Sequence, residues 1–112
     1  MSVVSTEYER VCVVQLKNDL SGDESAEARK AVEESMQQNQ IVDFIIDLSG
    51  CSFIDSSGLE TLLWAKQRAE QMFGKMKLIN VDDNCRKILE ITRLDSKFEC
   101  CGDLASALKT MR

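Results

Sequence analysis

The sequence predicts a single α/β domain with a mixed central sheet, an N-terminal β pair and about four helices. Two stretches rich in β-branched residues open the chain, and a nearly continuous apolar run of strand length lies at 41–48. From about residue 40 onward, strand-like and helix-like patterns alternate. Such alternation implies parallel strands joined by right-handed crossovers. A chain of 112 residues is long enough for one hydrophobic core, so one domain is expected over residues 1–112.

The first half of the chain predicts a hairpin, a helix and a central strand. Residues 2–8 and 11–16 are separated by the polar Glu9 and Arg10, which favours an N-terminal hairpin. From residue 25 to about 38, small and apolar residues recur at helical spacing and charged residues occupy the other face. The run IVDFIIDL at 41–48 is typical of a central strand covered on both faces.

The second half predicts three more helices and two more strands. A helix from Ser57 to about Phe73 gathers leucines and alanines on one side, and Gly74 supplies a C-terminal stop. The segment MKLINV predicts a buried strand, and residues 83–92 form a third helical pattern. A short extended piece near 97–100 precedes a last helix that carries Leu104, Leu108 and Met111.

Composition excludes several classes of function. The formal charge of −5 and the absence of a Lys/Arg run argue against a nucleic-acid partner. No stretch approaches the roughly 20 apolar residues of a membrane span, so a cytoplasmic protein without membrane contact is expected. The five cysteines contain no C-x-x-C pair, which indicates neither a disulfide framework nor a zinc site. They are expected to be reduced and mostly buried thiols, and no metal or cofactor is expected.

The stretch DSSGLE at 55–60 places two hydroxyls at the start of a predicted helix. Ser57 followed three residues later by Glu60 has the form of a capping box, which assigns the Ser57 hydroxyl to the helix N-terminus. Ser56 then lies just outside the helix with no backbone role, and Gly58 leaves room for an approaching group. Cap and turn chemistry alone also explains this pattern.

An enzyme is not expected. The sequence has no histidine, which removes Ser-His and Cys-His catalysis. It also lacks a G-x-S-x-G elbow, a lysine at S-x-x-K spacing from Ser56 or Ser57, and a Walker loop. A hydrolytic Ser56 is therefore a distant alternative. What remains is a corner that another protein reads or modifies.

The segment FIIDLSGCSFIDSSGLETLL resembles the signature of the STAS domain family, and specifically the bacterial anti-sigma factor antagonists. The order of predicted elements is similar to that family over nearly the whole chain. The resemblance implies binding to an anti-sigma factor that is itself a serine kinase, release of a sigma factor, and loss of binding on phosphorylation. The family's acceptor serine follows the Asp directly and matches Ser56. A serine phosphatase acting on phospho-Ser56 is the implied opposing partner.

The expected partner surface extends beyond the acceptor serine. Where many family members read G-E-L-D, this chain reads KNDLSGDES, so the usual Asp is either displaced to Asp23 or replaced by Ser21. A helical projection places Trp64 opposite the apolar face, where it is either an interface anchor or a ring folded over its neighbours. The residues expected to contact a partner are Asp55, Ser57, Gly58, Leu59, Glu60, Trp64, Ser21 and Asp23. The alternative function is a non-switching STAS docking subunit of a transporter or larger signalling assembly.

Overall fold

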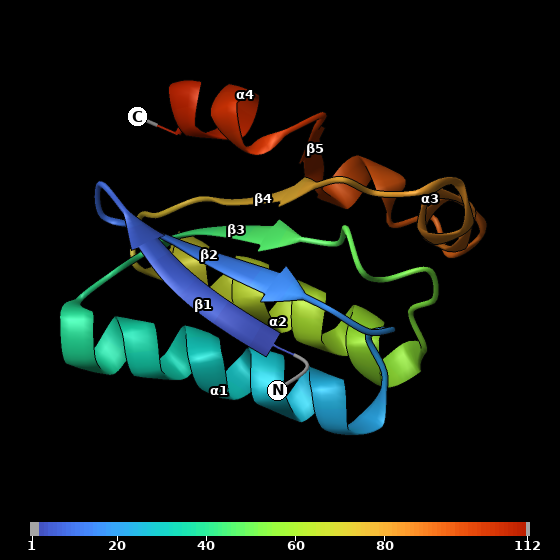
Figure 1. Ribbon diagram of the computed structural model, residues 1–112, viewed down its shortest axis with the longest axis horizontal. Coiled ribbons are helices and arrows are strands. Elements are labelled where there is room, and N and C mark those ends of the chain that lie inside the picture. The colour runs from blue at the N-terminus through green and yellow to red at the C-terminus, as the bar shows by residue number, and fades with distance from the viewer. Residues whose placement is uncertain (1–2, 112) are drawn as a thin grey trace.

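A computed structural model describes residues 3–111 and shows a five-stranded sheet with helices on both faces (Figure 1). The sheet order is β1-β2-β3-β4-β5, with β1 antiparallel to β2 and all other neighbours parallel. The strands are β1 Val3–Tyr8, β2 Val11–Leu16, β3 Asp43–Asp47, β4 Met76–Ile79 and β5 Glu99–Cys101. The α-helices are α1 Gly22–Asn39, α2 Ser56–Gln71, α3 Asp83–Ile91 and α4 Leu104–Lys109.

The order of the strands determines which helices share a face. The β2-α1-β3 and β3-α2-β4 connections both advance in the same direction across the sheet, and right-handed crossovers then place α1 and α2 on one face. Figure 1 shows these two helices side by side below the sheet and α4 above it. Helix α3 lies beyond the carboxyl ends of the parallel strands.

The sheet separates two hydrophobic clusters. Successive side chains of a strand point to opposite faces, so Val14 and Phe44 pack toward α1 and α2 while Val13 and Ile45 pack toward α4. The first cluster is the larger, and the second is completed by Ala107 of α4. The prediction that the IVDFIIDL strand is covered on both faces is thus confirmed.

The predicted hairpin, mixed sheet and four helices are confirmed, and their boundaries agree or differ by up to three residues. Met111, predicted in the last helix, lies beyond its end at Lys109, and residue 2 of the predicted first strand lies outside the described residues. One element was not predicted, a single 3₁₀ turn at Asp95–Lys97. The expected role of Gly74 is refined. Phe73 takes the left-handed conformation that ends α2, with φ of 63°, and the Gly74 N–H donates to the Ala69 carbonyl at 2.8 Å. Gly74 is required for space, because a Cβ there would lie 1.9 Å from the Val42 carbonyl oxygen.

Lys77 is a charged residue inside β4 that the sequence reading treated as part of a buried strand. Its side chain is 1% exposed and points toward α4. The Nζ atom donates to the Ala107 carbonyl at 3.3 Å and to the Thr110 hydroxyl, and it lies 3.3 Å from Glu99 Oε2. A buried ammonium is tolerated only when it is hydrogen-bonded and paired, so these three partners tie α4 and β5 to β4.

Gly74→Ala is expected to lower the free energy of unfolding by about 2 kcal/mol or more, because the added methyl overlaps the Val42 backbone. Gly102→Ala is the matched control, since a Cβ there meets nothing within 4 Å. The control is expected to change stability by no more than about 0.5 kcal/mol. Urea unfolding followed by circular dichroism measures both, and equal midpoints for the two variants would contradict the packing argument.

Candidate functional site

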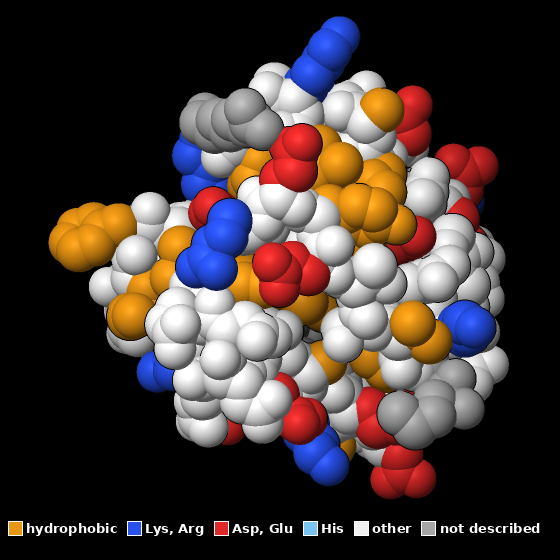
Figure 2. All heavy atoms as spheres, turned by 60° about the vertical axis from the view of Figure 1, so that its left-hand side comes forward, with side chains coloured by type: hydrophobic (Ala, Val, Ile, Leu, Met, Phe, Trp, Pro, Cys, Tyr) orange, Lys and Arg blue, Asp and Glu red, His pale blue; other side chains and the backbone are white. Residues whose placement is uncertain are grey.

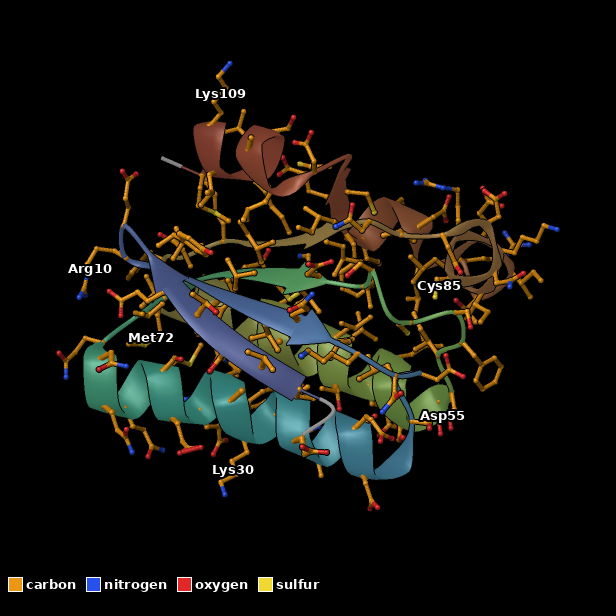
Figure 3. All side chains as sticks on the ribbon, in the orientation of Figure 1. Arg10, Lys30, Asp55, Met72, Cys85 and Lys109 are labelled. Carbon is orange, nitrogen blue, oxygen red and sulfur yellow. The ribbon has the colours of Figure 1, made fainter. Side chains whose placement is uncertain are left out.

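The serine corner, residues 52–60, is held against the segment that precedes α1. The Leu20 N–H donates to the Phe53 carbonyl at 3.0 Å, and the Asp55 N–H donates to the Leu20 carbonyl at 3.2 Å. Leu20 and Ile54 form an isolated parallel bridge, and both side chains are buried. Figure 3 shows Asp55 at the end of the molecule that also carries α3, beyond the carboxyl ends of the parallel strands. Chain segments more than 30 residues apart therefore form one surface here.

Asp55, and not Ser57, is the N-cap of α2. The helix begins at Ser56, and the Asp55 carboxylate accepts the Gly58 N–H at 2.8 Å. The predicted capping box of Ser57 and Glu60 is therefore wrong. A carboxylate three residues before an unpaired N–H is a strong acceptor, since its charge also interacts favourably with the helix dipole.

The same carboxylate organises the neighbouring hydroxyl. The Ser57 hydroxyl donates to Asp55 Oδ1 at 2.7 Å. This hydrogen bond lowers the pKa of Asp55 from its ordinary value, and the hydrogen bond from the Gly58 N–H has a smaller effect in the same direction. The Ser57 Oγ also lies 3.4 Å from the Oγ of Ser25 in α1. The half-buried Ser57 hydroxyl therefore has partners within the protein, as predicted, but these are Asp55 and Ser25 and not the helix N–H groups.

Ser56 is exposed and is the first residue of α2, so the prediction that it lies just outside the helix is wrong by one residue. Within residues 3–111, its hydroxyl makes no side-chain hydrogen bond, whereas that of Ser57 has two neighbouring oxygens. The expectation that Ser56 carries the freer hydroxyl therefore agrees with its position. The hydroxyl is accessible from solvent and stands beside the N–H groups of the first helical turn.

Gly58 is buried, and the space beside it is filled by the protein itself. A Cβ at this position would lie 2.3 Å from the Leu20 carbonyl oxygen and 2.8 Å from Ile54 Cγ2. The group that approaches Gly58 closely is therefore the Leu20 backbone. Gly58 was expected to leave room for a partner. The structure corrects this expectation, because the absence of a side chain at Gly58 allows the Leu20 backbone to contact the start of α2.

The other residues expected to contact a partner divide by exposure. Glu60 and Asp23 are exposed, and Asp23 lies in the first turn of α1. Leu59 is half-buried against the main hydrophobic cluster. Ser21 is the N-cap residue of α1, half-buried, and its side chain makes no capping hydrogen bond. Leu20 pairs with the serine corner, and Ser21 and Asp23 follow it closely in the chain. Their contact with a partner stays a prediction.

Trp64 does not stand free on the surface. It is half-buried, packs against the main cluster, and has the Arg29 guanidinium 4.5 Å from its ring centroid. The geometry is that of a cation–π contact between α1 and α2. The ring is therefore folded over its neighbours, as one of the two alternatives had it. Whether the exposed part of Trp64 also contacts a partner stays a prediction.

Three residues in or beside the serine corner were not identified from the sequence. Asp19 accepts the N–H and hydroxyl of Ser52 at 2.9 and 3.2 Å, which fixes the loop before α2. Ser25 is buried beside Ser57. Phe53 is 50% exposed, three residues before Ser56. Only Phe53 had a local signal, as an aromatic residue inside a polar loop; the other two depend on contacts across the chain.

Among residues 3–111, neither a metal-binding cluster nor the hollow between β1 and α1 involves the serine corner. Across residues 3–111 there is no group of three or more His, Cys, Asp or Glu side chains that could hold a metal ion. A hollow of about 560 Å³ lies between β1 and α1, lined by residues that include Val4, Lys30 and Gln38, and none of its lining residues belongs to the serine corner. Among the described helices, none has the length and apolar character needed to span a bilayer.

Large hydrophobic side chains are exposed elsewhere as well. Phe73 and Met72 at the end of α2 are 98% and 54% exposed, and Tyr8 is 44% exposed. Figure 2 views the molecule more from the side of the β1–β2 turn and shows hydrophobic patches interspersed with charged side chains. Figure 3 places Met72 and Arg10 at the opposite end of the molecule from Asp55. These residues are therefore separate from the serine corner.

The chain is similar to known proteins in both sequence and structure. An anti-sigma F factor antagonist of Paenibacillus polymyxa is 27% identical over 92 residues, which are 81% of this chain and 79% of that protein. An anti-sigma-factor antagonist (STAS) domain protein from Planctomyces limnophilus has a TM-score of 0.81 and 25% identity, covering 98% and 97% of the two chains.

The phosphorylated form of the Bacillus cell fate determinant SpoIIAA is also similar in structure. Its TM-score is 0.76 at 21% identity, covering 98% of this chain and 99% of that one, so the likeness shows a shared fold. The family model of the STAS domain matches residues 2–107, which is nearly the full sequence. The chain therefore belongs to the STAS domain family.

Proposed function

We propose that this protein is an anti-sigma factor antagonist whose binding is switched at Ser56. Unmodified, it binds an anti-sigma factor that is a serine kinase, and a sigma factor is released. The kinase transfers the γ-phosphoryl group of ATP to Ser56 Oγ, with release of ADP and a proton, and the modified protein dissociates. A serine phosphatase restores the unmodified form.

One observation carries this proposal: the Ser56 hydroxyl is exposed and unengaged at the start of α2, while Asp55 and Ser57 beside it are occupied with each other. The relatives support it, since one is named an anti-sigma F factor antagonist and one similar structure is of a phosphorylated protein. ATP and its magnesium belong to the kinase, so this chain needs no cofactor of its own. The sequence has no histidine that could accept the Ser56 proton, and the relative named an anti-sigma F factor antagonist supports a binding protein over an enzyme.

The helix N-terminus decides where the switch acts. A phosphate adds about −1.5 to −2 charge, taking the formal charge from −5 to about −7. Dipole and N–H groups favour an anion at the first turn, so phosphorylation is not expected to unfold α2. The dianion would instead stand beside the carboxylates of Asp55 and Glu60. Repulsion and the desolvation of this cluster would then weaken a docked complex.

One experiment distinguishes the phosphorylation switch from a non-switching docking subunit. The purified protein is incubated with magnesium, ATP and each anti-sigma factor kinase encoded in the source genome, and its intact mass is measured. Addition of one phosphoryl group, mapped to Ser56, supports the switch. A stable complex without modification would instead support a non-switching docking subunit.

Ser56→Ala is expected to abolish phosphoryl uptake in this assay, because no second hydroxyl of the corner is free. Ser57→Ala is the control, and it should still be phosphorylated, since the Ser57 hydroxyl serves the interior of the corner. Uptake retained in Ser56→Ala and lost in Ser57→Ala would reverse the assignment of the acceptor.

Ser56→Asp is expected to weaken binding to the kinase by about tenfold or more, because it adds a negative charge where the complex excludes water. Ser96→Asp adds the same charge at an exposed serine of the 3₁₀ turn and should leave the affinity unchanged. Titration calorimetry compares the two. Equal affinity of Ser56→Asp and the unmodified protein would rule out repulsion as the cause of release.

Acidification is expected to weaken the cap of α2. The folded-state pKa of Asp55 is lowered, so its contribution to stability is present above the ordinary carboxyl pKa and is lost as the pH falls through the depressed value. Asp55→Asn should therefore lower the urea midpoint at pH 7, and the difference should shrink as the pH falls below the ordinary Asp pKa of about 3.9. Glu60→Gln removes an exposed carboxylate of the same helix as the control. A difference that stayed constant with pH would contradict the charged cap.

A further inference from the structure

Two cysteines far apart in the sequence meet beside the serine corner. Cys51 lies in the loop between β3 and α2, and Cys85 lies in the first turn of α3. Their sulfur atoms are 3.9 Å apart, and both residues are buried. Backbone carbonyls orient them, since Cys51 Sγ donates to the Phe53 carbonyl at 3.2 Å and Cys85 Sγ approaches the Cys51 carbonyl at 3.4 Å. Figure 3 shows Cys85 on the side of α3 that faces this loop.

The other three cysteines have different surroundings. Cys12 is buried and receives a hydrogen bond from the Ser35 hydroxyl at 3.2 Å. Cys100 and Cys101 are neighbours in β5, so their side chains point to opposite faces of the sheet. All five cysteines fall within residues 3–111, and Cys51 with Cys85 is the pair whose sulfurs are recorded in contact. The contact is therefore specific to the loop and α3.

We propose that Cys51 and Cys85 form a reversible redox modification site, which a hydroperoxide converts to a disulfide in the folded protein. Cys51, as the thiolate, attacks the peroxide oxygen; an S–O bond forms, the O–O bond breaks, and an alcohol or water leaves with the thiol's proton. The Cys85 sulfur then attacks the sulfenic sulfur, and water leaves with the second thiol proton. Two thiols and one hydroperoxide thus give one disulfide, one alcohol or water, and one water.

Geometry and environment fix the order of these steps. Burial raises the pKa of both thiols, and for Cys85 the nearby Cys51 and Asp82 raise the pKa further, so Cys51 is the more readily ionised of the two. Its loop neighbours Ser52 and Phe53 are exposed, so the path of a small oxidant from solvent to Cys51 is short. The sulfurs must then approach by about 2 Å to reach bonding distance.

The consequence of the bond is local. It would tie the loop that ends in Asp55 to α3, across 34 positions of the sequence. Closing such a loop reduces the freedom of the unfolded chain and stabilises the folded one if its geometry is unstrained. The inference does not depend on phosphorylation of Ser56, because it concerns the chemistry of the sulfur atoms alone.

The test uses the full chain with Cys100→Ser and Cys101→Ser, which leaves three cysteines and three possible pairings. The protein is treated with hydrogen peroxide, folded or in urea, alkylated, and digested without reduction for mass spectrometry. In urea the three linkages should occur within about threefold of one another, because loop length changes the closure probability only slowly. In the folded protein the Cys51–Cys85 linkage should exceed the others by about tenfold or more, because contact replaces the search for a partner, and a thiol reductant should remove it.

Two further variants separate a real site from chance oxidation. Adding Cys12→Ser should leave the yield of the Cys51–Cys85 linkage unchanged. Adding Cys85→Ser should abolish crosslinking in the folded protein and leave a sulfenic acid on Cys51, which dimedone captures; circular dichroism verifies that this variant folds. Equal proportions of the three linkages in folded and urea-treated samples would overturn the proposal. So would oxidation of Cys51 to a sulfinic acid in the folded protein without any crosslink.

Discussion

The position of the serine corner depends on the close packing of Gly58 against the Leu20 carbonyl. A side chain at residue 58 would overlap that oxygen at 2.3 Å, so only glycine lets α2 begin directly beside the segment that enters α1. The backbone bonds of Leu20 to Phe53 and Asp55 then fix the loop from both sides. Asp19 adds a second attachment through Ser52. The loop that precedes the exposed Ser56 is thus held at several points by the segment before α1.

The corner also separates the roles of two adjacent hydroxyls without any difference in residue type. Ser57 points toward Asp55 and the buried Ser25, whereas Ser56, one helical step earlier, points to solvent. Successive residues of an α-helix are rotated by about 100°, which is enough to turn one serine toward the protein and the other toward solvent. The Ser57 hydroxyl has partners within the protein and the Ser56 hydroxyl is exposed, so the fold itself distinguishes the two serines.

Most of the fold was predictable because strand and helix periodicity is a local property. The continuous apolar run of β3 and the spaced leucines of α2 were sufficient to identify those elements. The errors were contacts between elements. The sequence could not reveal that Asp55 outcompetes Ser57 as the cap, or that α1 covers Trp64 through Arg29. Lys77 was missed for the same reason, since its partners come from β5 and from α4 and the residue after it.

The buried ammonium of Lys77 has an effect on how the C-terminal part of the chain behaves. Its partners lie on β5, on α4 and at Thr110, so none can be withdrawn alone without leaving a charge or a polar group unsatisfied among valines and isoleucines. Partial detachment of α4 is therefore disfavoured, and this helix should come away from the sheet only together with β5. Fraying of α4 would be replaced by one concerted opening, in which β5 and α4 behave as a single cooperative unit.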